Sequence, residues 1–504
     1  MVRRARDPGG SRETGRVAAV RSKISSFLRS QWRWHTRPRF PLPLPEAEAW
    51  REIEGTQLSL PTSEQPEVSV IIPAYGQLAT TWSCLRSLAG VPAGKSIEVI
   101  VANDCSPDRT SEMLSRVHGV RTVENPENLG FLRTCNRAAR EARGRYLCLL
   151  NNDTLLTPDW LSPMVESFEL FPRAGLVGAK LLFSDGRLQE AGGTAFRDGT
   201  TSHYGRRKDP ARPEYSFARR VDYCSAACAL MPKALWDELG GFDEYYAPAY
   251  YEDTDLAFRV RRAGYEVIYQ PATTIVHFEG LTHGKVKSKG QAKTPSKNLI
   301  ANRQKFFERW SELLLSEHAP PESRTWSATD RRRGPGLLVL SEGPLTPNGG
   351  AAAAALAADA AGFQVTLWSP VHDPGSASDS LQRRGVEVLY PPYSRPVADF
   401  LRSSEVARFG ALLVWDHEDA PQLLSTARRT AGHLKVFAFL SRRTARVQSA
   451  PDEGADPLRC FDAVLTDDES LRAALTVRLP HTRLFATTDA ELWHVLARVV
   501  RTQR

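Results

Sequence analysis

Two amides and a carboxylate, Asn151, Asn152 and Asp153, follow directly on the short apolar run at residues 146–150. Such a run is typical of a buried strand, and the strands of an open α/β sheet end at the edge where ligands bind. A carboxylate at that edge can hold a divalent cation, which in turn holds phosphate groups. The alternative is a plain surface turn, because Asn and Asp both favour turns.

A second group of acids, Glu252, Asp253 and Asp255, lies at the start of an expected helix that ends at Gly264. The helix dipole favours carboxylates at this end, and capping explains one of them. Three acids within residues 252–255 exceed what capping needs, and their mutual repulsion requires a cation or a proton nearby. A carboxylate placed there can take a proton from a substrate hydroxyl.

His277 follows the apolar pair Ile275 and Val276 at the end of another expected strand. A histidine after apolar residues is more often a satisfied core residue than a ligand. Its position at a strand end favours a second interpretation, in which a neutral imidazole completes a metal site with Asp153.

The elements that must position these groups alternate regularly along residues 68–150. Strands are expected at 68–72, 97–101, 120–123 and 146–150, with helices between them. This βαβ order predicts a parallel sheet with right-handed crossovers. A polar cluster follows each strand, at residues 73–75, 103–104, 125–128 and 151–153. Because the carboxyl ends of parallel strands share one edge, these clusters are expected to converge on one crevice.

With these motifs in order, residues 67–310 resemble an inverting family 2 glycosyltransferase with the GT-A fold, in particular its rhamnosyltransferase-like subset. The resemblance implies a set of residues that bind the nucleotide sugar. They are Pro73 and Tyr75 in the first turn, Asn103 and Asp104 at the family's Asp-Asp-Gly-Ser position, Asn128 and Gly130 in its Asn-x-Gly-Phe segment, and Asn151 and Asn152 at its Asp-x-Asp position. Asn in place of Asp at 103 and 151 leaves fewer anionic ligands than the family pattern.

The resemblance also implies the roles of the other candidate residues. Asp153 and His277 are implied as ligands of a divalent cation, Mn²⁺ or Mg²⁺, and Asp253 as the catalytic base, with Glu252 beside it. The implied activity is the transfer of a hexosyl or rhamnosyl group from a nucleotide-diphosphate sugar, with inversion. The acceptor would be a hydroxyl of a saccharide or a lipid-linked saccharide, in the synthesis of a bacterial surface polysaccharide.

Two alternatives use the same residues differently. An inactive glycosyltransferase-like scaffold or a carbohydrate-binding protein would not need the acids at 104, 153 and 253 or His277, all of which are present. A nucleotidyltransferase on a related fold would use the metal carboxylate but would need no base at Asp253.

The βα pattern resumes after an expected linker at residues 311–335 and predicts a second, Rossmann-like α/β domain over residues 336–504. This domain resembles the amino-terminal half of a GT-B glycosyltransferase, with Asn348, Gly349 and Gly350 at its first βα turn. It is expected to be non-catalytic or to handle the acceptor. Residues 416–419, Asp-His-Glu-Asp, are its best candidate site, with a polar loop as the alternative.

The first 45 residues form a basic arm and a Pro-rich linker, and a connecting segment follows at 46–66. The chain has a net charge of +8, and its positive charge is concentrated in this arm. Apolar residues recur there at helical spacing, so the arm is either an amphipathic helix on an anionic membrane or a disordered tail. No nucleic-acid partner is expected, because no recognised nucleic-acid motif accompanies the charge.

The location of the protein is predicted from what the sequence lacks. It has no apolar run of the roughly 18 residues that span a membrane and no signal-peptide pattern. The seven cysteines are scattered, and the close pair Cys224 and Cys228 reads as core thiols, with a metal site as the second interpretation. A cytoplasmic protein is expected, which the arm can hold against the inner face of the cell membrane.

Overall fold

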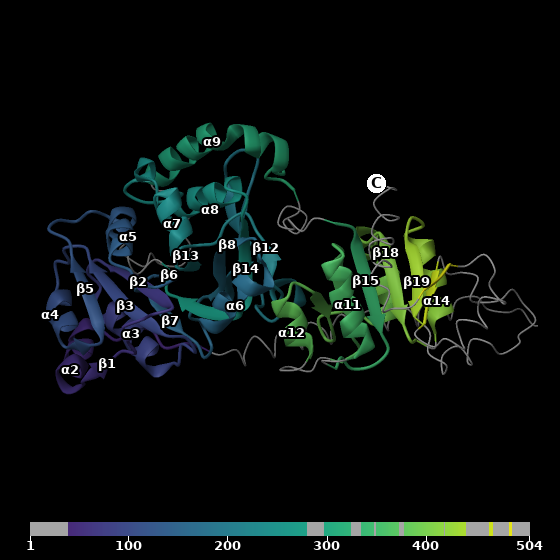
Figure 1. The fold of residues 1–504 in the computed structure, drawn as a ribbon, viewed down its shortest axis with the longest axis horizontal. Helices are drawn as coiled ribbons and strands as arrows, with labels where there is room; N and C mark the ends of the chain where they lie inside the picture. The colour runs from purple at the N-terminus through teal and green to yellow at the C-terminus, as the bar shows by residue number, and fades with distance from the viewer. Residues whose placement is uncertain are drawn as a thin grey trace, which may run out of the picture.

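The computed structural model describes residues 39–279, 297–323, 334–346, 349–371, 377–417, 419–439, 463–466 and 483–485. They form two α/β units that lie side by side (Figure 1). Among these residues no helix is both long and apolar enough to cross a membrane. Residues 1–38, which contain most of the predicted basic arm, are outside the described residues, as are Asn348 and Glu418.

The first unit is built on one large mixed sheet of strand order β12-β14-β8-β13-β6-β2-β3-β5, with β7 paired to β14 and β9 paired to β8. Its strands are β2 (Val68–Ala74), β3 (Ile97–Asn103), β5 (Val120–Glu124), β6 (Tyr146–Leu150), β7 (Thr154–Leu156), β8 (Ala174–Leu182), β9 (Leu188–Glu190), β12 (Arg219–Arg220), β13 (Cys228–Pro232) and β14 (Glu266–His277). The strands β6, β2, β3 and β5 are parallel, as the alternating pattern predicted. β13 is antiparallel and joins β6 to β8.

Helices cover both faces of this sheet, which explains its unbroken apolar strands. All seven residues of β3 and all five of β6 are buried, as expected for strands packed on both sides. The helices are α2 (Glu46–Gly55), α3 (Leu78–Gly90), α4 (Thr110–Ser115), α5 (Phe131–Arg140), α6 (Ser162–Leu170), α7 (Lys233–Leu239), α8 (Glu252–Arg262) and α9 (Lys297–Glu317). One core lies under α2, α3, α4 and α6, and the other under α5, α7, α8 and α9.

Smaller elements complete the first unit. β1 (Leu58–Ser59) pairs with β4 (Val117–His118), and β10 (Gly193–Ala195) forms a hairpin with β11 (Thr201–His203). Single-turn helices η1 (Pro213–Tyr215) and η2 (Glu244–Tyr246) lie in the loops. Cys224 and Cys228 are buried free thiols in the two cores, in agreement with their interpretation as core residues.

The second unit contains a fully parallel sheet of order β17-β16-β15-β18-β19-β20-β21. Its strands are β15 (Gly336–Ser341), β16 (Gln364–Trp368), β17 (Glu387–Leu389), β18 (Ala411–Trp415), β19 (Lys435–Phe439), β20 (Ala463–Leu465) and β21 (Arg483–Phe485). Its helices are α11 (Gly350–Ala360), α12 (Ala377–Arg383), α13 (Val397–Leu401), η3 (Ser404–Arg408) and α14 (Ala420–Thr430). The order reverses between β15 and β18, as in doubly wound sheets. The predicted second α/β domain is therefore present, and its resemblance to half of a GT-B enzyme stays a prediction.

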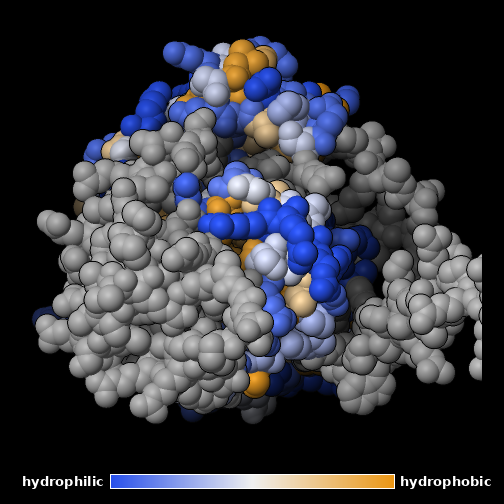
Figure 2. All heavy atoms as spheres, turned by 90° about the vertical axis from the view of Figure 1, so that its right-hand side faces the viewer, coloured by the Kyte–Doolittle hydropathy of each residue, from blue (hydrophilic) through white to orange (hydrophobic). Residues whose placement is uncertain are grey.

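The two units contact each other through α12 and the loop that follows β17. Arg383 lies 3.3 Å from Glu166 and 3.4 Å from Asp159 of the first unit. Tyr390 donates a hydrogen bond of 3.2 Å to the carbonyl of Ala211. The face of the molecule on the right of Figure 1 is mostly hydrophilic where its residues are described, with apolar residues in small separate patches (Figure 2).

Candidate active site

The polar clusters after β3 and β5 meet at the carboxyl edge of the first sheet, as the sequence predicted. Asp104 is buried, and its Oδ1 accepts hydrogen bonds from the Leu129 amide at 2.7 Å and from Asn125 Nδ2 at 2.8 Å. Its Oδ2 accepts from the Gly130 amide at 2.9 Å. Asp104 therefore fixes the loop that leads into α5. Its predicted contact with a nucleoside stays a prediction.

Asn103 explains one departure from the family pattern. Its Nδ2 donates to Glu124 Oε2 and to Ser111 Oγ, both at 2.7 Å, and its Oδ1 accepts from the Ser106 amide at 3.1 Å. An aspartate here would place a second carboxylate against Glu124 without a donor between them. The amide is thus needed to hold the loop, and the side chain is turned away from solvent, at 1% exposure.

The residues predicted for the first turn and the segment before α5 are open to a ligand. Tyr75 is 45% exposed, and Pro73 is half-buried beside it at the end of β2. Asn128 is exposed, and its Oδ1 accepts from the Gly130 amide at 3.1 Å. Gly130 has φ = 80°, which favours glycine at this turn into α5. These four residues can contact a nucleotide without displacing the core.

Asp153 and His277, which lie far apart in sequence, are in contact. Antiparallel pairing of β7 with β14 brings them together, and His277 Nε2 lies 3.1 Å from Asp153 Oδ1. His277 Nδ1 lies 3.1 Å from Gln189 Oε1. Gln189 Nε2 donates to Glu279 at 2.8 Å, which fixes the orientation of this amide.

This orientation determines what the Asp153–His277 pair can bind. Gln189 Oε1 is an acceptor, so His277 Nδ1 donates to it, and Nε2 of the ring faces the Asp153 carboxylate. Nε2 and the Asp153 oxygen, 3.1 Å apart, can share a proton or a cation. Asn151, two residues before Asp153, has a buried Oδ1 that receives no hydrogen bond from the described residues. These donors fit a divalent cation.

The chain supplies only part of such a coordination shell. Among the described residues no cluster of three or more His, Cys, Asp or Glu side chains has the arrangement of a metal site. Oxygens of a bound diphosphate would have to complete the shell, which is common for Mg²⁺. Asn152 is turned away, because its Nδ2 donates to Thr81 Oγ1 of α3 at 2.9 Å.

Asp253 is linked to the same edge through residues 225–227, the short segment before β13. The Ala226 amide donates to Asp253 Oδ2 at 3.4 Å, and the Asn151 amide donates to the Ala227 carbonyl at 3.0 Å. The Thr254 amide donates to Asp253 Oδ1 at 2.7 Å. Through these hydrogen bonds the 225–227 segment connects Asp253 of α8 to Asn151 at the end of β6. Such a connection is expected if both residues border one crevice.

The first two acids of α8 differ in how far they are exposed. Burial and the charge of Asp253 raise the pKa of Glu252 to about 8, so Glu252 is protonated at neutral pH. Glu252 is 8% exposed, and no donor among the described residues reaches its Oε2. Burial and the nearby Glu190 also raise the pKa of Asp253, which is half-buried and so the more accessible of the pair. Asp253 is therefore the better placed base.

Asp255, the third acid, is structural. It is fully buried and accepts hydrogen bonds from Arg259 at 2.7 Å, Trp310 at 2.9 Å and Arg309 at 3.1 Å. Tyr246 adds a hydroxyl donor at 3.2 Å. This network ties α8 to α9, so one of the three acids indeed serves the fold.

The sequence did not reveal Gln189, Glu190 and His203, which lie beside the predicted residues. Glu190 Oε2 lies 2.5 Å from His203 Nδ1. Arg206 donates a hydrogen bond of 2.6 Å to Glu279. Burial acts to raise the pKa of Glu279, but the hydrogen bonds that Glu279 accepts from Arg206 and Gln189 outweigh burial and lower this pKa to about 2. β9, β10 and β11 have three residues each, too short for any periodicity to show.

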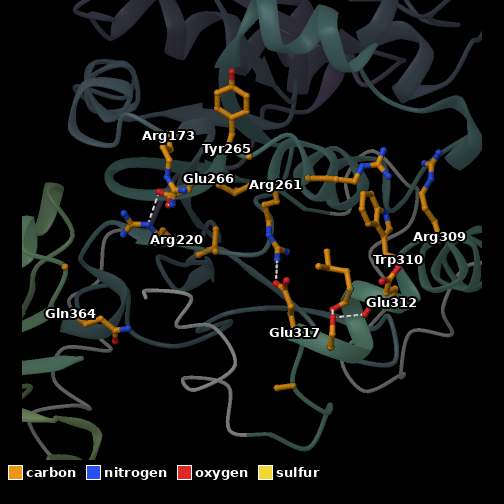
Figure 3. Close-up of a pocket in the computed structure, with 18 of the residues that line it drawn as sticks. Arg173, Arg220, Arg261, Tyr265, Glu266, Arg309, Trp310, Glu312, Glu317 and Gln364 are labelled. Atoms are coloured by element: carbon orange, nitrogen blue, oxygen red, sulfur yellow. Dashed lines mark hydrogen bonds and ion pairs between the residues drawn. The ribbon is translucent and has the colours of Figure 1, made fainter. Parts of the chain in front are cut away.

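A further cavity lies away from these residues. It measures about 1080 Å³ and is lined by residues of β12, β14, α8 and α9 together with residues 359–364 of the second unit, and none of the predicted site residues borders it. Figure 3 shows its charged wall, where Arg173 and Arg220 both pair with Glu266. Four of its arginines, Arg173, Arg220, Arg261 and Arg309, pair with carboxylates of the first unit.

Part of the first unit matches a known protein family. Residues 69–240 match the family model described as Glycosyl transferase family 2. This match confirms the expected glycosyltransferase domain and, with the α/β sheet, the predicted fold class. The matched segment holds the residues from β2 to α7, including Asp104 and Asp153.

Curated relatives match over part of the chain. The "Uncharacterized protein y4gI" of Sinorhizobium fredii is 30% identical over 283 residues, which cover 54% of this chain and 29% of the relative. The "O-antigen biosynthesis protein RfbC" of Myxococcus xanthus is 28% identical, with 44% and 18% covered. The "N-acetylglucosaminyl-diphospho-decaprenol L-rhamnosyltransferase" of Mycobacterium tuberculosis is 24% identical, with 38% and 69% covered. The chain thus spans less than a third of the length of the first two relatives.

Proposed function

We propose that residues 67–310 form a metal-dependent, inverting glycosyltransferase that acts in the synthesis of a bacterial surface polysaccharide. The observation that carries the proposal is the link of Asp253, through the 225–227 segment, to Asn151, which lies two residues before Asp153 of the Asp153–His277 pair. The match of residues 69–240 to glycosyl transferase family 2 supports it.

At the donor end, Asp153, His277 and the Asn151 amide oxygen would hold Mn²⁺ or Mg²⁺. The cation, when bound, neutralises the charge of the leaving nucleoside diphosphate. Tyr75 and Asn128, which are exposed at this edge, would contact the nucleoside. The loop that Asp104 fixes would bring Asn128 and Gly130 to the donor.

At the acceptor end, Asp253 takes the proton of an acceptor hydroxyl. The hydroxyl oxygen attacks the anomeric carbon from the face opposite the diphosphate, the bond from this carbon to the diphosphate oxygen breaks, and the configuration inverts. Burial raises the pKa of both acids, and Asp253 is the more exposed of the two, which favours it as the base. The proton remains on Asp253 until solvent removes it.

The relatives' names guide the choice of substrates. One is named as a rhamnosyltransferase acting on N-acetylglucosaminyl-diphospho-decaprenol and another as an O-antigen biosynthesis protein. We therefore propose a rhamnosyl or hexosyl donor and a saccharide or lipid-linked saccharide acceptor. Such an acceptor would place the enzyme at the inner face of the cell membrane.

The test is a transfer assay with the full-length protein, Mn²⁺ and a panel of UDP-, GDP- and dTDP-sugars. Acceptors are free oligosaccharides and polyprenyl-diphosphate N-acetylglucosamine. We expect release of nucleoside diphosphate together with a product one sugar heavier, whose anomeric configuration is opposite to that of the donor. Synthesis of a nucleotide sugar from sugar phosphate and nucleoside triphosphate would instead identify a nucleotidyltransferase, and the absence of any turnover would identify a scaffold.

A further inference from the structure

Glu190, at the end of β9, has both carboxylate oxygens engaged inside the first unit. Its Oε1 accepts a hydrogen bond of 3.0 Å from the Ser225 amide, and its Oε2 lies 2.5 Å from His203 Nδ1 on β11. The residue is 1% exposed. A carboxylate this deeply buried is costly unless each oxygen is satisfied, so both contacts are needed to keep it there.

Ser225 is the first residue of the 225–227 segment, and the next two residues reach the proposed active site. The Ala226 amide donates to Asp253, and the Ala227 carbonyl accepts from the Asn151 amide. Three consecutive residues therefore have three separate anchors: Glu190, Asp253 and Asn151. Without the hydrogen bond to Glu190, Ser225 would be free to move, and the Ala226 amide that contacts Asp253 would move with it.

Glu190 and His203 also form a charge pair close to Asp253. Burial acts to lower the pKa of His203, but the Glu190 carboxylate outweighs burial and raises it. The negative charge of Glu190 adds to burial in raising the pKa of Asp253. The other titratable groups that face this cluster are Glu252 and Tyr251 beside Asp253, Tyr223 and Cys224 before the segment, and Arg206 and Glu279 beside His203.

We propose that Glu190 and His203 are positioning residues for Asp253: Glu190 orients the 225–227 segment whose Ala226 amide contacts Asp253, and together with His203 it sets the charge beside that segment. The inference rests on the proposed function, in which Asp253 is the base. Neither residue needs to touch the substrate.

Two variants with opposite charge effects test it. Glu190→Gln keeps an acceptor for the Ser225 amide but removes the negative charge, so the acid limb of the kcat/KM profile should move to lower pH. His203→Gln keeps an N–H donor toward Glu190 but removes the positive charge, so the same limb should move to higher pH. Glu312→Gln, an exposed residue of α9, is the control and should leave the profile in place.

A third variant tests the anchor itself. Glu190→Ala removes the bond to the Ser225 amide, and kcat should fall by roughly 100-fold, the scale of a misplaced reacting group. The KM for the donor should change little, because the Asp153 end is untouched. Glu190→Gln should keep most of kcat at its own pH optimum. An equal loss of kcat in both variants would contradict a role in orientation.

A readout without turnover separates this inference from the proposed function. The protein is labelled with ¹³C at the aspartate carboxyl carbons, and the Asp253 signal is assigned by its absence in Asp253→Asn. Its titration should move to lower pH in Glu190→Gln and to higher pH in His203→Gln. Shifts in the same direction, or none, would overturn the inference. If the wild type transfers no sugar, the proposed function fails, but this titration still decides whether the pair acts on Asp253.

Discussion

At the scale of single residues, the three acids at the start of α8 differ because their surroundings differ. Asp255 is enclosed by Arg259, Arg309 and Trp310, while Glu252 is buried and its Oε2 receives no hydrogen bond from the described residues. Asp253 keeps part of its surface open. A charged carboxylate with access to solvent can exchange protons with a substrate, and a sealed one cannot. For this reason we propose Asp253 as the base.

The substitution Asp253→Asn tests this assignment. Asparagine keeps the shape and an acceptor for the Thr254 amide but cannot take a proton, so kcat should fall by about 10²- to 10⁴-fold. Donor binding, measured by calorimetry with a nucleoside diphosphate and Mn²⁺, should be retained. Undiminished turnover would show that another group is the base.

Glu252 predicts a dependence of stability on pH. Its pKa is raised from 4.5 to about 8, so its protonated form contributes stability that is complete below pH 4.5 and lost as the pH rises through about 8. Glu252→Gln removes this dependence. Its Tm should exceed that of the wild type by roughly 2 °C or more at pH 9, with a smaller difference at pH 6. A difference that does not vary with pH would show that Glu252 is ionised throughout.

At the scale of elements, the position of the site depends on how closely β8 approaches the 225–227 segment. Gly178 of β8 faces Cys224, and a Cβ added at Gly178 would lie 2.2 Å from Cys224 Cβ and 2.4 Å from its Sγ. Neither atom can move freely, because Cys224 is buried in the core. Only glycine permits β8 to lie this close to the residue before the segment.

Gly178→Ala should therefore destabilise the first unit by about 1–3 kcal/mol through overpacking, measured as the free energy of unfolding in urea. It should also lower transfer activity, because Cys224 leads into residues 225–227. Gly90→Ala is the matched control, since a Cβ at Gly90 of α3 meets nothing within 4 Å. Equal effects of the two substitutions would contradict close packing at this point.

The strands and helices also show how much of the fold and of the candidate site could be predicted from the sequence. β2, β3, β5 and β6 are apolar runs with helices between them, so their order, and the convergence of the groups that follow them, could be predicted. The contact of His277 with Asp153 was also expected, and it is present at 3.1 Å, although its role as a metal site stays a prediction. Glu190 and His203 could not be found, because their contact depends on short strands whose pairing is set by tertiary packing rather than by local pattern.

At the scale of the whole molecule, the second unit contacts the first at the loop around residues 209–218. The Ala218 amide donates to the Gln382 carbonyl at 2.8 Å, and Tyr393 donates to Asp209 at 3.2 Å. The same loop begins near Arg206, which pairs with Glu279 two residues beyond His277. The second unit therefore supports a loop that borders the proposed donor site.

The double variant Arg383→Ala with Tyr393→Phe should loosen this docking. Each contact is partly exposed and contributes at most about 1 kcal/mol, so the interface should weaken while both units stay folded. Small-angle X-ray scattering should show a larger radius of gyration, with the thermal unfolding of the first unit unchanged. Arg402→Ala, which breaks an exposed ion pair with Asp399 inside the second unit, is the control and should scatter as the wild type does.

The most direct test of the whole account is calorimetric binding of a nucleoside diphosphate, either UDP, GDP or dTDP, with and without Mn²⁺. The wild type should bind one of them only when Mn²⁺ is present. Asp153→Asn should weaken this binding at least about 10-fold, as expected for a lost metal ligand, while Asp253→Asn should bind like the wild type. Binding that is independent of the metal and equal in Asp153→Asn would contradict a donor site at the end of β6.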